Sequence, residues 1–200
     1  MSACSRPLWR KPYRPRKRHV SEDGMDRLNR TVVLVGMMGA GKSSLGRRLA
    51  TRLNVGFRDA DTEIEEAAGC TISEIFARFG EGAFRDGERK VITRLLTEPA
   101  HILATGGGAF CDAETRARIK AGAMSVWIKA PVEVLLARVG RRDTRPLLRD
   151  GDPREILERL LAQREPLYAE ADLTVDSENG PHQVSVDRIL AALKEREVLE

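Results

Sequence analysis

The chain of 200 residues is 42% hydrophobic and 32% charged, a composition that fits a globular domain with a sizeable core and excludes a disordered or collagen-like polymer. No apolar run approaches the roughly 18 residues that a membrane-spanning helix needs. Aromatic residues make up only 4% of the chain, so aliphatic side chains must form most of the core. Such a core is typical of buried parallel strands covered by helices.

The formal net charge of +4 is concentrated at the start of the chain. Residues 1–20 hold +7 and no acidic side chain, which leaves −3 for residues 21–200. The segment contains three prolines, which break an amphipathic helix, and it lacks the apolar stretch of a secretory signal. It has three interpretations: a disordered extension, residues upstream of a true start at Met25, or an electrostatic tether to nucleic acid or an acidic partner.

We expect residues 1–28 to be a basic extension to a single domain over residues 29–200. For the folded domain, with its slightly negative charge, we expect neither nucleic acid nor a membrane as partner. Cys4, Cys70 and Cys111 are too far apart in the sequence for a zinc or redox motif. They indicate reduced thiols and a cytoplasmic protein.

Strand-like and helix-like segments alternate from Thr31 onward. The expected strands cover residues 31–35, 55–58, 101–104, 125–129 and 173–175. The expected helices cover residues 43–53, 62–68, 72–79, 81–96, 113–120, 132–139, 157–168 and 184–194. No hairpin signal joins any two strands, so the pattern predicts an α/β fold in which helices flank both faces of a five-stranded parallel sheet.

A glycine-rich loop stands between the first expected strand and the first expected helix. Residues 36–43, GMMGAGKS, match G-x-x-x-x-G-K-[ST] in the place where that motif binds phosphates. Backbone N–H groups and the helix N-terminus would surround the phosphates, with Lys42 on the β- and γ-phosphates and Ser43 on Mg²⁺. The alternative is a glycine-rich turn with a chance lysine. Because the chain lacks the guanine-reading N-K-x-D motif, ATP is the expected nucleotide.

Two further segments follow expected strands, at the sheet edge where open parallel sheets bind ligands. Of Asp59 and Asp61, one carboxylate could hold the water shell of Mg²⁺ and the other could accept the proton of an attacking hydroxyl. The alternative is that the two residues only begin the next helix, with Asp61 as its N-cap. The three glycines at 106–108 allow close approach of backbone to a substrate, or they form a flexible turn. Arg85 and Arg164, taken alone, are equally well explained as solvated helix residues.

The order and spacing of six segments resemble the shikimate kinase family over about residues 31–195. The segments are residues 36–43, Asp59-Ala60-Asp61, Phe84-Arg85, Gly106-Gly107-Gly108, Arg145-Pro146-Leu147-Leu148 and Arg164-Glu165-Pro166-Leu167-Tyr168. The resemblance implies a single-domain P-loop kinase fold with a mobile lid at about residues 138–152, and a monomer. It also implies ATP-dependent phosphorylation of the 3-hydroxyl of shikimate, with Mg²⁺ as cofactor, on the pathway to chorismate and the aromatic amino acids.

The same resemblance implies which residues form the site. ATP would be held by Gly39, Ala40, Gly41, Lys42, Ser43, Ser44, Arg138 and Arg145, and Mg²⁺ by Ser43 and, through water, Asp59. Shikimate would be held by Asp61, Arg85, Gly106, Gly107, Gly108 and Arg164, and the catalytic residues would be Lys42, Asp61 and Arg145. Phe76, Phe84, Glu88 and Pro146 would shape the pocket. Residues 176–181 lack an arginine that some members place against adenine.

Two other functions remain open on the sequence. One is a P-loop kinase of another small hydroxylated acid, such as gluconate. The other is a non-catalytic or nucleic-acid-associated ATP module, which the basic start of the chain suggests.

Overall fold

The structure is a computed structural model that describes residues 28–139, 151–177 and 182–199. Arg145 and Pro146, most of the expected lid and nearly all of the basic extension lie outside the described residues. So does most of the segment that lacks the adenine-binding arginine. In the part of the chain that is described, no helix is both long enough and apolar enough to cross a bilayer.

Five parallel strands form one sheet in the order β2-β3-β1-β4-β5. The central strand, β1 (Thr31–Val35), pairs with β3 (His101–Ala104) on one side and with β4 (Ala123–Lys129) on the other. The edge strands are β2 (Gly56–Asp59) and β5 (Leu173–Asp176). The predicted α/β fold with a five-stranded parallel sheet is therefore confirmed.

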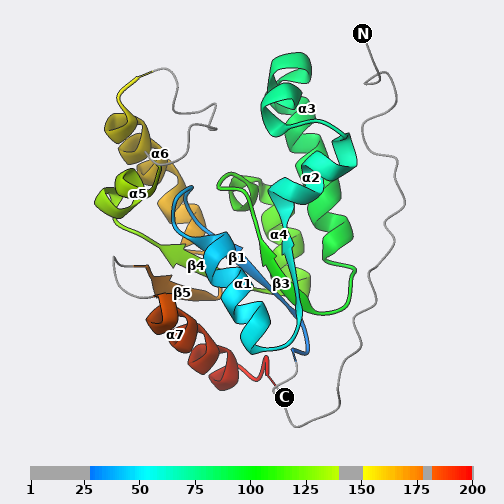
Figure 1. The fold of residues 1–200 in the computed structure, drawn as a ribbon, viewed down its shortest axis with the longest axis vertical. Coiled ribbons are helices and arrows are strands. Elements are labelled where there is room, and N and C mark those ends of the chain that lie inside the picture. The colour runs from blue at the N-terminus through cyan, green and yellow to red at the C-terminus, as the bar shows by residue number, and fades with distance from the viewer. Residues whose placement is uncertain (1–27, 140–150, 178–181, 200) are drawn as a thin grey trace.

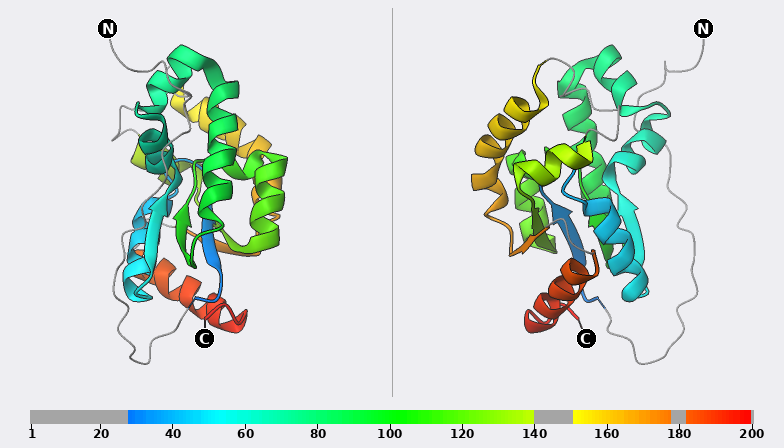
Figure 2. Two further views of the ribbon diagram at one scale, coloured as in Figure 1. Left: turned by 90° about the vertical axis from the view of Figure 1, so that its right-hand side faces the viewer. Right: turned by 60° about the vertical axis from the view of Figure 1, so that its left-hand side comes forward.

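Helices cover both faces of this sheet (Figures 1 and 2). On one face lie α1 (Lys42–Arg52) and α7 (His182–Glu195), and on the other lie α3 (Ile72–Leu95) and α4 (Ala113–Gly122). The four apolar residues 32–35 of β1 are completely buried because helices pack against both of its faces. Burial of each such side chain stabilises the fold by about 1.5–3 kcal/mol.

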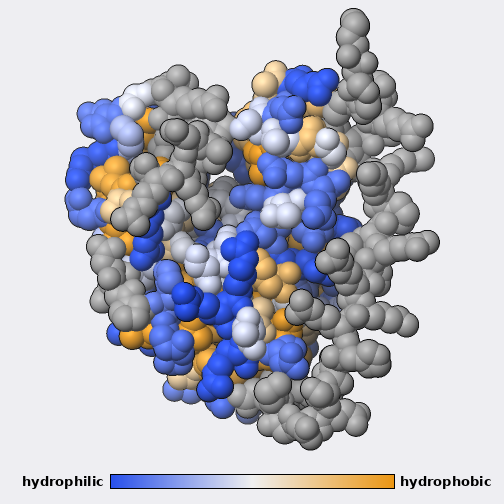
Figure 3. Space-filling view, in the orientation of Figure 1, coloured by the Kyte–Doolittle hydropathy of each residue, from blue (hydrophilic) through white to orange (hydrophobic). Residues whose placement is uncertain are grey.

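The remaining elements surround the carboxyl ends of the strands. They are α2 (Ala60–Ala68), the short 3₁₀ helix η1 (Ala109–Cys111), α5 (Val132–Val139) and α6 (Pro153–Tyr168). Figure 3 shows the surface hollowed between the part formed by α2 and α3 and the part formed by α5 and α6. This hollow lies over the strand ends at which the sequence places its candidate residues.

Two helices differ from expectation for identifiable reasons. The segments 72–79 and 81–96 form one element, α3, which is kinked at Gly80 where φ is 78° and ψ is 174°. Glycine adopts this backbone conformation without the strain that a side chain would add, so the chain continues into the second half of the helix. Helix α6 starts four residues before the expected position 157, because Asp152 caps it and Pro153 occupies its first turn.

Candidate active site

The phosphate loop joins the carboxyl end of β1 to α1. Gly41 occupies the N-cap of α1 with φ 97° and ψ 13°, a left-handed conformation that turns the chain into the helix. The Nζ atom of buried Lys42 donates to the carbonyl oxygens of Gly36 at 2.8 Å and Met37 at 2.9 Å. The ammonium group therefore already lies across the loop, where phosphate oxygens can replace the two carbonyls.

Ser43 and Asp59 meet beside this loop. The Ser43 hydroxyl donates to Asp59 Oδ2 at 2.7 Å, and Asp59 Oδ1 accepts the backbone N–H of Asp61 at 3.2 Å. Asp59 has extended backbone angles and caps α2. The alternative in which Asp61 caps the next helix is therefore wrong, because the cap lies two residues earlier.

A magnesium ion fits the Ser43 and Asp59 pair in its chemistry. Mg²⁺ takes oxygen ligands and usually keeps several waters and phosphate oxygens, so a hydroxyl and a carboxylate beside a phosphate loop suit it. Within residues 28–139, 151–177 and 182–199, no three His, Cys, Asp or Glu side chains are grouped to hold a metal ion by themselves. An ion here would complete its coordination with phosphate and water oxygens.

The glycine loop after β3, which we define as residues 106–108, has charged side chains packed against it. A Cβ atom on Gly106 would lie 2.9 Å from Glu88 Oε1 and 3.0 Å from Asp61 Oδ1. One on Gly108 would lie 2.6 Å from Nη1 of Arg85. A side chain at either position would force these charged groups to move, so close approach of the charged groups favours glycine at positions 106 and 108.

Gly107 lies between the two halves of the site. Its added Cβ atom would lie 3.3 Å from the backbone nitrogen of Met38, in the phosphate loop, and 3.5 Å from Nη1 of Arg164, on α6. The glycine loop therefore contacts the phosphate loop directly. It brings the side chains that surround it next to the position expected for the nucleotide phosphates.

Arg85 is held in place by two carboxylates. Its Nη1 donates to Glu88 Oε2 at 2.7 Å, while its Nε and Nη2 donate to Glu81 Oε1 at 3.3 and 3.1 Å. Its guanidinium carbon also lies 5.1 Å from the centre of the Phe84 ring, which in turn packs against Phe76 with ring centres 4.8 Å apart. The Arg85 side chain is only 22% exposed, so the interpretation as a solvated helix residue is wrong.

Glu88 is almost completely buried and faces the glycine loop. Burial raises the pKa of Glu88, and the opposing effect of Arg85 does not cancel the rise. For Arg85 itself, burial lowers the pKa, but the Glu88 and Glu81 carboxylates together outweigh burial, so the pKa is raised. The Oε1 atom of Glu88, the one nearest Gly106, has no hydrogen-bond partner among the described residues.

Arg164 approaches the glycine loop from the other side of the hollow. Its Nη1 atom is buried and has no hydrogen-bond partner in the described part of the chain. A buried donor without an acceptor is costly, so this nitrogen marks a position where an acceptor on a ligand would be stabilising. The two arginines that were separated by about eighty residues in the sequence thus converge on Gly107 and Gly108.

Arg138 lies against the phosphate loop. From α5, its Nη1 donates to the Ala40 carbonyl at 3.2 Å and to the Ser177 hydroxyl at 3.0 Å, and lies 3.4 Å from the Gly39 carbonyl. The His182 ring, which the sequence did not single out, lies 3.8 Å from where a Cβ on Gly41 would be. Burial, together with Arg48 and Arg138, lowers the pKa of His182 and favours its neutral form.

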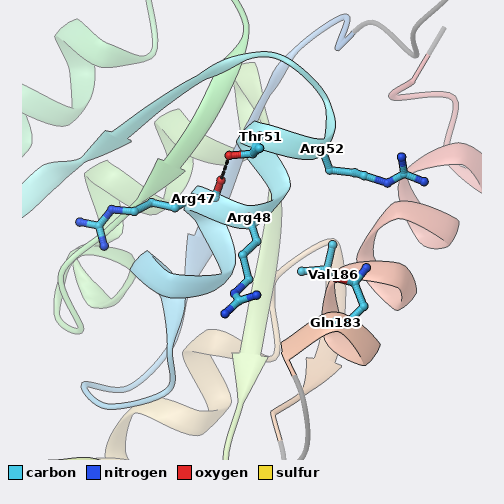
Figure 4. A pocket seen from close by; sticks show the side chains of 6 residues that line it. All are labelled: Arg47, Arg48, Thr51, Arg52, Gln183 and Val186. Carbon is cyan, nitrogen blue, oxygen red and sulfur yellow. Dashed lines mark hydrogen bonds between the residues drawn. The ribbon is translucent and has the colours of Figure 1, made fainter.

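A separate cleft of about 330 Å³ lies between α1 and α7 (Figure 4). It is lined by Arg47, Arg48, Thr51, Arg52, Gln183 and Val186. In Figure 4 the three arginines of α1 point in different directions and do not converge on one point. Unlike the hollow over the strand ends, this cleft offers no set of groups aimed at a common ligand.

The sequence did not predict a role for Tyr168. This residue is completely buried at the end of α6, and its hydroxyl donates to the carbonyl of Gly107. Glu81, the second carboxylate on Arg85, was likewise not predicted from the sequence. The helical spacing of four residues between Glu81 and Arg85, and between Arg164 and Tyr168, was the available signal for both.

Comparisons with known proteins identify the family to which the chain belongs. The family model for shikimate kinase matches residues 38–194. A shikimate kinase of Caulobacter vibrioides is 58% identical over 176 residues, 88% of each chain, and one of Paramagnetospirillum magneticum is 59% identical over 167 residues, 84% of this chain and 86% of the relative. A solved structure, shikimate kinase from Acinetobacter baumannii in complex with shikimate, is 40% identical with a TM-score of 0.81, and the match covers 84% of this chain and 94% of that one. The chain therefore belongs to the shikimate kinase family.

Proposed function

We propose that this protein transfers the γ-phosphoryl group of ATP to the 3-hydroxyl of shikimate, giving shikimate 3-phosphate and ADP. The observation that carries the proposal is the convergence of Arg85 and Arg164 on a glycine loop that contacts the phosphate loop. Guanidinium groups bind carboxylates through paired, charge-assisted hydrogen bonds. A small hydroxylated acid would thus be held by its carboxylate beside the nucleotide.

Each side of the site has its own task in this proposal. Arg85 and Arg164 hold the carboxylate, and the backbone of Gly106, Gly107 and Gly108 contacts the rest of the molecule. Asp61, whose Oδ1 lies beside Gly106, orients the acceptor hydroxyl and accepts its proton. This carboxylate oxygen lies on the same side of Gly106 as Glu88 Oε1.

On the nucleotide side, we assign the phosphates to the loop of Gly39, Ala40, Gly41, Lys42, Ser43 and Ser44. Lys42 exchanges its two carbonyl partners for β- and γ-phosphate oxygens, and Arg138 stays against the loop from α5. Arg145, outside the described residues, is proposed to add a further positive charge at the phosphoryl group. Phosphoryl transfer has a loose, charge-rich transition state, so these cations supply more of the rate than a strong base would.

We propose Mg²⁺ as the cofactor, held by Ser43 directly and by Asp59 through water. When bound, the ion neutralises charge on the β- and γ-phosphates. The Ser43 hydroxyl, which donates to Asp59 at 2.7 Å, would present its oxygen to the ion and keep donating its hydrogen bond to Asp59. Asp59 would still cap α2 through its other oxygen.

The direct test is an ATP-dependent assay with purified protein and shikimate. We expect ADP and shikimate 3-phosphate in equal amounts, and much lower activity with gluconate and other hydroxylated acids at the same concentration. A higher specificity constant for gluconate would move the assignment to that substrate. Deletion of residues 1–24 should leave the rate unchanged, whereas a nucleic-acid-associated module would lose a salt-sensitive affinity for nucleic acid.

Several finer expectations stay predictions. They are the division at residues 28 and 29, the lid at about residues 138–152, the monomeric state and the cytoplasmic location. Light scattering would check the monomer, and cell fractionation would check the location.

A further inference from the structure

The Tyr168 hydroxyl lies where the phosphate loop, the glycine loop and α6 meet. It donates to the carbonyl of Gly107 and lies 3.8 Å from the sulfur of Met37, which belongs to the phosphate loop. The phenol ring packs against Trp127 of β4 with ring centres 5.9 Å apart. The buried Tyr168 side chain thus contacts the phosphate loop, the glycine loop and the sheet.

The bond to Gly107 determines how one peptide of the glycine loop is oriented. The described residues contain no cis peptide, so the carbonyl of Gly107 and the N–H of Gly108 point in opposite directions. With the carbonyl bound to a buried phenol, the Gly108 N–H is turned away from Tyr168. The same two glycines are the ones packed against Arg164 and Arg85, so rotation of this peptide would shift the backbone that both guanidinium groups contact.

Other groups would replace this hydroxyl poorly. Among the described residues, the other side-chain contact to the Gly107 carbonyl is the Cys111 thiol. Its sulfur lies 4.0 Å away, and a thiol is a weak donor. Burial raises the pKa of Tyr168 far above the neutral range, so the phenol keeps its proton and remains a donor. Tyr168 also follows Arg164 by four residues, which places the two side chains on the same side of α6.

We propose that Tyr168 is a positioning residue for the acceptor: its hydroxyl holds the Gly107 peptide so that the glycine loop and Arg164 keep the spacing that binds the carboxylate of shikimate. This inference rests on the proposed function, because shikimate is the ligand. Tyr168 is completely buried, so it acts through Gly107 and Arg164 and not by touching the substrate.

The test compares Tyr168→Phe with Thr31→Val in steady-state kinetics of the full chain. Thr31 provides a matched control, because its buried hydroxyl lies 3.4 Å from Nδ1 of His101 at the opposite end of β1. We expect Tyr168→Phe to raise KM for shikimate about tenfold and to leave KM for ATP within about twofold, as loss of one buried hydrogen bond on the acceptor side predicts. Thr31→Val should lower the unfolding temperature comparably and change neither KM.

An unchanged KM for shikimate in folded Tyr168→Phe, or an equal rise for both substrates, would overturn the positioning role. The proposed function fails separately, through a wild-type protein that does not phosphorylate shikimate. In that case the positioning role, which depends on the function, falls with it. An active wild type with an unaffected variant refutes the positioning role alone.

A second measurement covers the case in which Tyr168→Phe does not fold. The sequence contains two tyrosines, Tyr13 and Tyr168, so protein labelled with 3-fluorotyrosine gives two ¹⁹F resonances that Tyr13→Phe assigns. We expect addition of shikimate alone to move the Tyr168 resonance, because the ligand contacts the backbone to which its hydroxyl is bonded. A Tyr168 resonance that stays in place at saturating shikimate would contradict the proposal.

Discussion

The phosphate side and the acceptor side of this site are built in opposite ways. The phosphate side is one continuous loop, and its lysine is satisfied by the carbonyls of Gly36 and Met37. The acceptor side is assembled from α2, α3, the glycine loop and α6, and it leaves polar atoms of Glu88 and Arg164 without partners in the described residues. The phosphate loop makes its own hydrogen bonds before a ligand binds, whereas the acceptor side needs a ligand to supply hydrogen-bond partners.

This contrast predicts that changes on the phosphate side lower turnover most. In Lys42→Ala, kcat should fall at least about 100-fold, because a preorganised charge at the transferring group is lost. Binding of shikimate, measured by calorimetry without nucleotide, should stay near the wild-type value. The control is Lys120→Ala, which removes an exposed ammonium group bonded to Glu170 at 3.2 Å and should keep wild-type turnover. Near-normal turnover in Lys42→Ala would contradict the assignment.

Asp61 is the group proposed to accept the proton of the acceptor hydroxyl. Asp61→Asn keeps the shape of the side chain but removes the basic oxygen, so kcat should fall about 100-fold or more while KM for ATP is unchanged. Asp187→Asn, on α7, should have no kinetic effect. If Asp61→Asn keeps its rate, the proton must be accepted elsewhere and the assignment is rejected.

Alanine variants of Arg85 and Arg164 should both lower the affinity for shikimate, but only Arg85→Ala should lower the folding stability. Either alanine variant should weaken shikimate binding by about 1.5–3 kcal/mol through loss of a charge-assisted contact. Arg85→Ala also leaves the Glu88 carboxylate buried without its ion pair, at a cost on the order of 3 kcal/mol of folding free energy. Arg164→Ala should leave stability nearly unchanged.

Urea unfolding and shikimate titration of both arginine variants measure the two effects. Arg159→Ala, an exposed position on α6, serves as the control. Equal losses of folding stability in Arg85→Ala and Arg164→Ala would contradict the expectation that Arg164 contributes to ligand binding and little to folding.

The smallest expected effect is a pH dependence caused by Glu88. Because its pKa is raised on folding, the folded state binds more protons than the unfolded state between the ordinary value of 4.5 and the raised value. Its contribution to stability therefore decreases as pH rises through that window, with a slope of at most about 1.4 kcal/mol per pH unit. Glu88→Gln removes this slope, so the stability difference between variant and wild type should change with pH across the window and be constant above it. A difference that is constant throughout would contradict the raised pKa.

The sequence was sufficient to predict the fold class and to locate the phosphate loop between the first strand and the first helix. A contiguous motif between a strand and a helix places Lys42 and Ser43 by chain connectivity alone. Asp59 ends β2 and Asp61 lies in the first turn of α2, as their positions after the expected strand indicate. The strand order, with β3 inserted between β1 and β2, was not predicted. Nothing local encodes it, because it depends on which helices cover which face.

The acceptor side could be predicted only through resemblance to a family. Arg85 and Arg164 are 79 positions apart, and no periodicity relates them to Gly106, Gly107 and Gly108. Their convergence depends on how α3 and α6 pack around the carboxyl ends of the strands. The local sequence pattern does not contain this tertiary packing.

The unpartnered nitrogen of Arg164 has a consequence for inhibitor chemistry. A carboxylate or another planar anion gains a charge-assisted contact there, while a neutral ester or amide in its place gives the buried guanidinium a weaker acceptor and adds bulk. Isosteres that keep the negative charge, such as tetrazoles or acyl sulfonamides, should therefore retain binding. Uncharged prodrug forms should inhibit only after hydrolysis restores the anion.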